Sequence, residues 1–379
     1  MKISPKSRIV LVAGLAAGAI FFLIERRSLV SSRFPPARSF QVLETVIRHV
    51  RNDYLEDVDV RKTMLGAFQG LMGSLDALSS YLDKAAVAKF SSPKKLALND
   101  IGAIVYKKPG VFPVVAGVVE GSPAEKAGIK IGDYLSAIEG RSTIVWSLNE
   151  VRWFLKDETR ASLKIRLIRE NNTQELTVER APLYSRGLDW TARKDAAGIL
   201  RVHHLHPGLT AEFRASVLPR LQGAKGPLIL DLRECFEGEI EEARAFVNLF
   251  LKAETIGRFE KKGGEMEVLA CPAEPALAGV PLVIWVGPAT MGPAELAAGA
   301  LRELRKARIV GSPTLGLVAK QELYALTGGD ALLLTTGAFA LPSGEKLLGT
   351  GVSVDAKVES EGRDPKPYLE KSFDPADDR

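Results

Sequence analysis

Apolar residues recur at helical spacing near the start of the chain. Val42, Leu43, Val46, Ile47 and Val50 fall on one face of a helix. A second amphipathic stretch covers Val60 to Leu75 and ends near Gly73, and glycine commonly follows the last turn of a helix. The pattern predicts a pair of helices within an N-terminal helical segment, residues 40–96.

Short β-branched runs replace this pattern between residues 101 and 180. The candidate strands are Gly102–Tyr106, Val114–Val119, Tyr134–Ile138, Leu163–Arg169 and Gln174–Glu179. A short helix, Ser147–Lys156, is predicted between the third and fourth strands, and Ser122-Pro123 opens a further helical turn. These elements predict a small β-rich domain over residues 97–183.

Strands alternate with helices from Gly198 onward. Pro227–Asp231 and Leu282–Val286 are short apolar strands, and Ile240–Leu251 and Ala294–Arg305 have helical patterns. Apolar strands interleaved with helices are typical of a buried, largely parallel sheet. The predicted fold class is therefore an α/β core with a mostly parallel sheet, residues 184–360, joined to the β-rich domain and the helical segment. A polar tail, residues 361–379, is expected to follow.

An uninterrupted apolar run, residues 9–24, follows Lys2, Lys6 and Arg8. It is slightly short of the ~20 residues usual for a spanning helix. A cleaved signal peptide would require small residues at the end of the run, which instead reads Phe21-Phe22-Leu23-Ile24. We therefore expect an uncleaved signal anchor, a transmembrane helix over residues 1–28 with a linker over 29–39. The body of the protein is expected outside the cytoplasm, in a bacterial periplasm or cell envelope.

The bulk composition excludes some classes of function. The 51 Lys and Arg residues, against 46 Asp and Glu, are spread along the chain without a dense basic cluster. Nucleic-acid binding, which requires a concentrated basic footprint, is therefore not expected. Cys235 and Cys271 have no metal-ligand spacing and could either pair or lie buried as small apolar groups. His203, His204 and His206 lack a nearby acidic or thiol partner, so neither a metal nor another cofactor is expected.

Several ordered motifs resemble those of C-terminal processing peptidases, also called tail-specific proteases. Residues 75–82 resemble the signature Leu-Asp-Pro-His-Ser-Ser-Tyr-Leu, and residues 121–133 resemble the PDZ segment Gly-Ser-Pro-Ala-x-x-Ala-Gly-x-x-x-Gly-Asp. Residues 229–233 are similar to the strand that leads into the family's oxyanion loop. Residues 333–336, 342–344 and 349–352 are similar to its closing strands. The resemblance covers roughly Phe40 to Val358.

The resemblance implies a serine peptidase with a Ser/Lys dyad and a PDZ domain that captures the C-terminal tails of proteins. It implies that a peptide would bind beside a carboxylate-binding loop made of Asp100, Ile101, Gly102, Ala103 and Ile104. It also implies dimers formed through the N-terminal helices, either a homodimer or a heterodimer with an active relative.

The expected catalytic positions depart from the family pattern. The family's nucleophile lies three residues before a glutamate, and alignment on Glu295 places Gly292 there. The general-base lysine lies 25 residues further on in the family, a position that Leu317 occupies here. Both replacements fit one alignment without a gap, and the glutamine that supports the family's dyad is retained as Gln321. No intact catalytic pair is therefore expected.

The oxyanion loop has changed as well. The family's Asn-Asn-Pro-Gly-Gly corresponds to residues 234–238, so that Glu237 replaces a glycine and Gly238 is kept. A carboxylate at this position opposes the stabilisation of an oxyanion. Two rescues can be considered: a shifted dyad of Thr290 and Lys320, or Cys235 as the nucleophile.

The sequence therefore favours a membrane-anchored, non-catalytic homologue that binds protein C-terminal tails through its PDZ domain, as an adaptor or regulator. An active serine-type endopeptidase with relocated catalytic residues and a structural envelope protein without a peptide ligand remain as alternatives.

Overall fold

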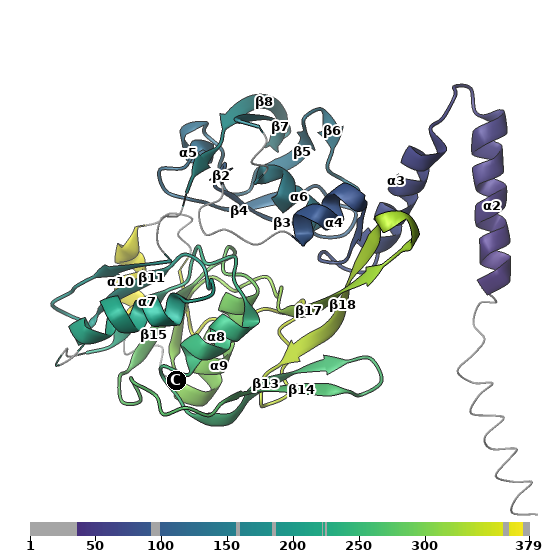
Figure 1. The fold of residues 1–379 in the computed structure, drawn as a ribbon. Helices are drawn as coiled ribbons and strands as arrows, with labels where there is room; N and C mark the ends of the chain where they lie inside the picture. The colour runs from purple at the N-terminus through teal and green to yellow at the C-terminus, as the bar shows by residue number, and fades with distance from the viewer. Residues whose placement is uncertain are drawn as a thin grey trace, which may run out of the picture. The chain divides into compact units, whose positions relative to one another are not determined.

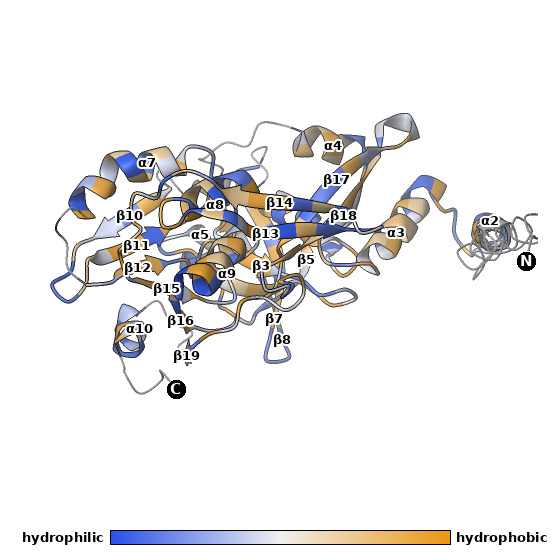
Figure 2. Ribbon diagram, turned by 90° about the horizontal axis from the view of Figure 1, so that it is seen from below, coloured by the Kyte–Doolittle hydropathy of each residue, from blue (hydrophilic) through white to orange (hydrophobic). Residues whose placement is uncertain are grey.

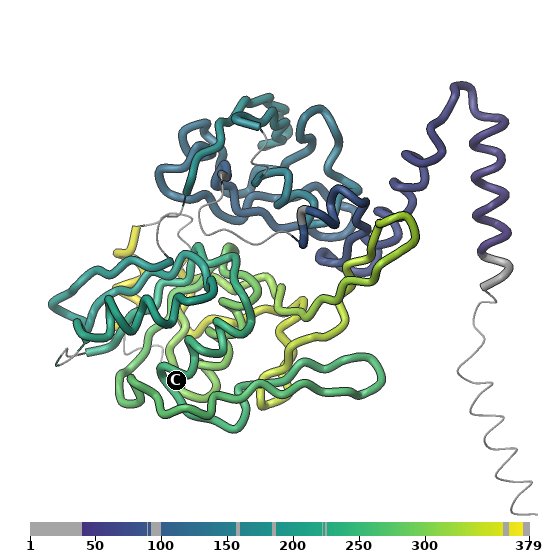
Figure 3. Tube along the Cα trace, in the orientation of Figure 1, coloured from purple at the N-terminus to yellow at the C-terminus, as the bar shows by residue number. Residues whose placement is uncertain are grey.

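The structure is a computed structural model that describes residues 36–91, 99–156, 160–183, 187–221, 223, 226–358 and 364–373 (Figures 1 and 3). The chain divides into two compact units, residues 1–65 and residues 66–379. The first unit contains α2 (Pro36–Asp53) and the start of α3 (Val60–Gly73). Its apolar residues Phe40, Val42 and Val46 are exposed.

The second unit begins within α3 and contains a β-rich domain. Its main sheet is antiparallel, with strand order β3-β4-β5-β7-β8, and β6 pairs with β5. The strands are β3 (Ala103–Tyr106), β4 (Val114–Val118), β5 (Tyr134–Ile138), β6 (Arg141–Ser142), β7 (Ser162–Arg169) and β8 (Asn172–Glu179). The helices are α5 (Pro123–Lys126), capped by the Ser122 side chain, and α6 (Leu148–Leu155), capped by Ser147. A two-stranded sheet of β2 (Asn99–Asp100) and β9 (Ala181–Pro182) joins the ends of the domain.

The core of the second unit contains a six-stranded sheet in the order β10-β11-β12-β15-β16-β19. Its strands are β10 (Leu188–Thr191), β11 (Gly198–Val202), β12 (Leu228–Asp231), β15 (Leu282–Val286), β16 (Arg308–Gly311) and β19 (Ala356–Lys357). All neighbours are parallel except β10 and β11. The accompanying helices are α7 (Leu209–Ser216), η1 (Leu218–Leu221), α8 (Ile240–Val247), α9 (Pro293–Arg305) and α10 (Pro365–Ser372), the last within the expected polar tail.

A second sheet of the core is antiparallel throughout. It contains β1 (Ser80–Leu82), β13 (Ala253–Lys261), β14 (Met266–Cys271), β17 (Ala319–Ala325) and β18 (Ala331–Ala340). Two hairpins, β13–β14 and β17–β18, build most of it. α4 (Lys84–Phe90) follows β1, and η2 (Thr327–Gly329) lies in the β17–β18 connection.

The predicted fold class is wrong about the sheets. The sheets are mostly antiparallel, because parallel pairing is confined to one of them and the hairpins β13–β14 and β17–β18 form another. Among the residues that the structure describes, no helix is long and apolar enough to cross a membrane. The predicted transmembrane segment, residues 1–28, lies outside the described residues.

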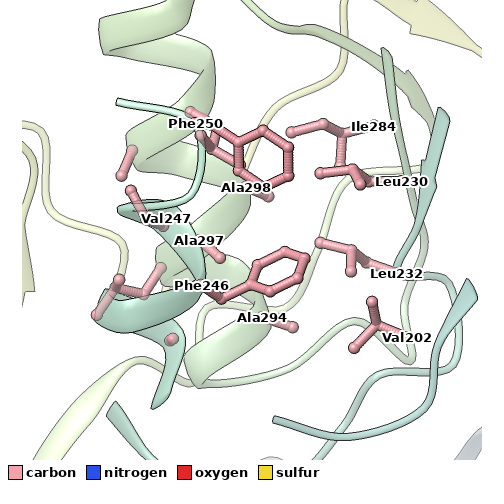
Figure 4. Packing of buried hydrophobic residues seen from close by; sticks show 14 of the residues in the cluster. Val202, Leu230, Leu232, Phe246, Val247, Phe250, Ile284, Ala294, Ala297 and Ala298 are labelled. Carbon is pink, nitrogen blue, oxygen red and sulfur yellow. The ribbon is translucent and has the colours of Figure 1, made fainter. Parts of the chain in front are cut away.

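Apolar side chains of α8 and α9 fill the space over the parallel sheet. Figure 4 shows Phe250, just beyond α8, facing Leu230 and Ile284, and Phe246 of α8 facing Leu232; all five are buried. Strands β12 and β15 are drawn mainly in the hydrophobic colour in Figure 2, as expected for strands that are covered on both faces. This packing fixes the end of β15 and the start of α9, between which the expected nucleophile position lies.

The two cysteines do not pair. Cys235 and Cys271 are both free and buried, so the sequence alternative of burial as small apolar groups holds.

Candidate functional site

Gly292 lies in a sharp turn between β15 and α9. Its backbone has φ 57° and ψ −118°, a conformation that residues with a side chain rarely adopt. A strained strand-to-helix turn of this kind presents the nucleophile of α/β-hydrolases. A Cβ placed on Gly292 would have the carbonyl oxygen of Leu317 as its nearest neighbour, at 3.7 Å. The two positions expected to carry the dyad therefore lie next to each other, and no atom would clash with a Cβ at Gly292.

The Glu295 carboxylate ties these two positions together. One oxygen accepts hydrogen bonds from the backbone N–H groups of Gly292 (2.8 Å) and Leu317 (2.7 Å). The other accepts from the Thr314 hydroxyl (2.6 Å) and the Gly316 N–H (2.6 Å). Burial raises the pKa of Glu295, and these four donors oppose that rise. Glu295 is thus the buried hub of the turn and of the segment that faces it.

The side chain of Leu317 belongs to an apolar cluster instead of reaching toward a reacting group. It is 9% exposed and packs with Phe236, Ala289 and Met291. The same cluster contains the core of the β-rich domain. The expected base position is therefore filled by an isobutyl group at the junction between the two domains.

The residues considered as rescues are engaged elsewhere. The Thr290 hydroxyl donates to the carbonyl oxygen of Leu232 (2.8 Å) and accepts from the Gly287 N–H (3.0 Å). Lys320 forms an ion pair with Glu267 of β14. Each thus has a local structural partner.

Gln321, the retained family glutamine, lies on β17. Its amide nitrogen donates to the carbonyl oxygen of Leu78 (2.9 Å), so it fixes the segment before β1.

Glu237 and Gly238 lie where the resemblance places the oxyanion loop. Glu237 forms an ion pair with Lys156, which follows α6, and the Lys156 ammonium also lies 5.4 Å from the centre of the Phe236 ring. Gly238 forms a parallel bridge with Leu205, and a Cβ on Gly238 would lie 2.6 Å from the Cβ of Leu205. The Glu237 carboxylate is thus paired across the domain junction, and a close backbone approach requires glycine at position 238.

Two further side chains of the β-rich domain approach the turn at Gly292. The Arg152 guanidinium of α6 donates to the sulfur of Met291 (3.0 Å), and burial lowers the pKa of Arg152 to about 10 while Glu295 opposes this. Burial and the charge of Glu295 both raise the pKa of Tyr106, at the end of β3. The helix α6 and the strand β3 therefore border the expected active site.

His204 lies beside the altered loop. Its pKa is lowered to about 4, first by burial and then by the charges of His206, His203 and Lys156. A histidine with so low a pKa is neutral at pH 7. Within the described residues no group of three or more His, Cys, Asp or Glu is placed to hold a metal ion.

The expected carboxylate-binding loop lies at the start of β3. Asp100, Ile101, Ala103 and Ile104 are all buried, and Gly102 has a φ of 85°. The N–H of Gly102 donates to the Asp100 carboxylate of the loop itself (3.0 Å). One donor that the sequence analysis assigned to a ligand is thus used within the loop.

Comparison with known proteins identifies both domains. Residues 197–358 match the sequence profile of peptidase family S41, and residues 114–169 match that of the PDZ domain. The carboxy-terminal processing protease CtpA of Bacillus subtilis is 28% identical over 370 residues, which cover 96% of this chain and 78% of that protein. The chain belongs to the C-terminal processing peptidase family. The two matched ranges lie inside the predicted domains, whose exact boundaries stay predictions.

A second relative and a solved structure agree with this family assignment. A probable CtpA-like serine protease of Staphylococcus haemolyticus is 23% identical over 356 residues, 93% of this chain and 71% of that protein. The solved structure of the photosystem II D1 C-terminal processing protease has a TM-score of 0.70 and 20% identity, and covers 88% of this chain and 89% of that one. The latter similarity shows that the fold is shared.

Sequence reasoning missed the side chains that surround the expected active site. In the sequence, Glu295 only anchors the alignment with the family motif. No pattern in the neighbouring residues predicts that its carboxylate accepts hydrogen bonds from four buried donors. Arg152 and Lys156 have the spacing of a solvent-exposed helical face, so no sequence signal separates them from surface residues. Only the packing of the PDZ domain on the core brings them to the junction.

Proposed function

We propose that this chain is a non-catalytic member of its family, whose PDZ domain binds the tails of other proteins in extended form. The observation that carries the proposal is the pair of positions that face each other at the β15–α9 turn. Gly292 offers only hydrogen there, and Leu317 offers only an isobutyl group.

Peptide hydrolysis by this family's chemistry requires three components. A hydroxyl must attack the carbonyl carbon, and a neutral lysine must take its proton. Preorganised donors must stabilise the oxyanion. Glu237 adds a negative charge at the loop expected to supply those donors, and its pairing with Lys156 keeps it there. Loss of the nucleophile alone lowers the rate of a well-studied serine protease by about 10⁶.

The neighbouring groups support the same conclusion. The Thr290 hydroxyl is fully buried and hydrogen-bonded to backbone, and the Lys320 ammonium is paired with Glu267. Burial strongly raises the pKa of the Cys235 thiol, which disfavours the thiolate that a nucleophile requires. None of these three groups is poised to replace the missing dyad.

The peptide-binding half of the proposal rests on the PDZ domain. Among the described strands, β3 is the last of its sheet, and α6 packs beside it. An extended peptide can add to such an edge as a further strand, with its side chains between the strand and the helix. The fold therefore offers a place for a bound tail that needs no catalytic group.

The test combines active-site labelling with a cleavage assay on the full chain. We expect no labelling by a fluorophosphonate and no cleavage of a tailed test protein by the unaltered protein. Thr290→Ala serves as the matched variant. Cleavage that this variant abolishes would contradict the proposal and favour a peptidase with relocated residues.

The double variant Gly292→Ser/Leu317→Lys asks whether the frame around the turn still supports the reaction when both groups are restored. A role as adaptor outside the cytoplasm, alone or paired with an active relative, stays a prediction that cell fractionation and co-purification would test.

A further inference from the structure

The carboxylate-binding loop of the PDZ domain has a tightly fixed backbone. The carbonyl oxygen of Ile101 accepts from the Ala124 N–H (2.7 Å), and that of Gly102 accepts from the Val119 N–H (2.8 Å). A Cβ on Gly102 would lie 2.3 Å from the Cβ of Ser122, so only glycine fits. The loop therefore cannot move its donors toward a ligand without disturbing these contacts.

Within the described part of the sheet, β3 is an edge strand. Ala103 lies opposite Val118 in the β3–β4 ladder, and the bond from the Val119 N–H to the Gly102 carbonyl oxygen makes this a non-hydrogen-bonded pair. The N–H and C=O of Ala103 consequently point away from β4, toward the edge with which no described strand of this sheet pairs. A peptide can hydrogen-bond to β3 here as an added strand.

Asp100 changes what the loop can accept. In the expected mode of binding, backbone N–H groups of this loop would hold the terminal carboxylate of a tail. The Gly102 N–H already donates to the Asp100 carboxylate, and Asp100 is only 6% exposed. An incoming carboxylate would find this donor used and a fixed negative charge beside it, and like charges at close range disfavour binding.

We propose that this PDZ domain binds internal extended segments, whose backbone continues past the loop, and rejects free C-termini because the Asp100 carboxylate occupies the loop. The bound segment of a partner protein then lies upstream of its terminal carboxylate. This inference rests on the proposed peptide-binding function and makes Asp100 its specificity-determining residue.

The test measures binding to the full chain of one synthetic library of ten-residue peptides, prepared as free acids and as C-terminal amides. We expect amides to bind as tightly as the matching acids, or tighter. A library that binds only as free acids would overturn the inference and leave the proposed function standing. A library that binds in neither form would overturn both.

Two variants of Asp100 separate its charge from its hydrogen bond. Asp100→Gly frees the Gly102 N–H and removes the charge, so we expect matching acids to gain at least about tenfold over amides, the scale of one charge-assisted hydrogen bond. Asp100→Asn keeps an acceptor for Gly102 and removes only the charge, so a smaller gain is expected. Asp195→Asn, at an exposed side chain of the core that pairs with Arg193, is the control and should leave the ratio unchanged. An unchanged ratio in Asp100→Gly would contradict the inference.

Discussion

The two places where this chain is expected to contact a peptide differ in what their side chains present. At the β15–α9 turn the backbone has the strained conformation of a strand-to-helix turn that can present a nucleophile, but Gly292 has no side chain. At the start of β3, the loop expected to bind a carboxylate contains Asp100, whose own carboxylate accepts a hydrogen bond from the Gly102 N–H. In both cases the main chain persists while one side chain decides the chemistry.

This comparison shows why a shared fold is weak evidence for a shared activity. The hydrogen bonds that shape each loop are made by neighbouring backbone and by buried hubs such as Glu295, which do not depend on the residue at the reacting position. The frame of such a loop can therefore be kept when the residue at the reacting position differs.

The largest effect is expected from removing the Glu295 carboxylate, which accepts four hydrogen bonds at the β15–α9 turn. Glu295→Ala leaves buried donors from Gly292, Gly316 and Leu317 without an acceptor, each at a cost of about 1–3 kcal/mol. We expect the free energy of unfolding to fall by at least about 3 kcal/mol. Denaturant titration of the full chain, followed by fluorescence, measures the change.

Glu303→Ala provides the matched control for Glu295. Glu303 lies on the same helix, α9, and its carboxylate accepts from the N–H and the hydroxyl of Ser343 at an exposed site. We expect a loss of about 1 kcal/mol or less. Equal losses in the two variants would show that the turn at Gly292 does not depend on its buried carboxylate.

The next effect tests whether His204, which lies beside the loop that contains Glu237, is shielded from water. His204 has a pKa of about 4 in the folded protein against 6.5 for an ordinary histidine. Between these values the unfolded chain binds more protons than the folded one, so stability rises with pH across this window. We expect acidification to destabilise the unaltered protein by up to about 3 kcal/mol more than His204→Asn.

Urea titrations of the two proteins between pH 4.5 and pH 7 measure this difference. Parallel profiles for His204→Asn and the unaltered protein would mean that solvent reaches His204.

Much of the fold could be predicted from local patterns. Alternation identified the strands of the PDZ domain, and apolar runs identified β12 and β15, because these signals depend only on which faces are buried. The antiparallel sheet was missed. β13 mixes polar and apolar residues without regular alternation, and its pairing with β18 joins residues that lie far apart in the chain.

The site divides in the same way. Ordered motifs placed Gly292 and Leu317 in one register, and the structure brings the two positions together. The contacts of Arg152 and Lys156 could not be predicted, because they arise where the PDZ domain packs on the core. The sequence predicted Asp100 as part of the ligand loop, and only the structure shows that its carboxylate accepts a hydrogen bond from the Gly102 N–H of the same loop.

The smallest effect is expected at the junction between the PDZ domain and the core, which separates the two places compared above. Lys156 and Glu237 form an ion pair whose side chains are 14% and 36% exposed, so solvent screens it only in part. A double-mutant cycle with Lys156→Met and Glu237→Gln isolates the pairwise energy, which we expect to be about 1 kcal/mol. The exposed pair Lys252 and Glu274, changed in the same way, should couple by no more than about 0.3 kcal/mol. Equal coupling in the two cycles would mean that the ion pair between Lys156 and Glu237 does not help to hold the PDZ domain against the loop at residues 234–238.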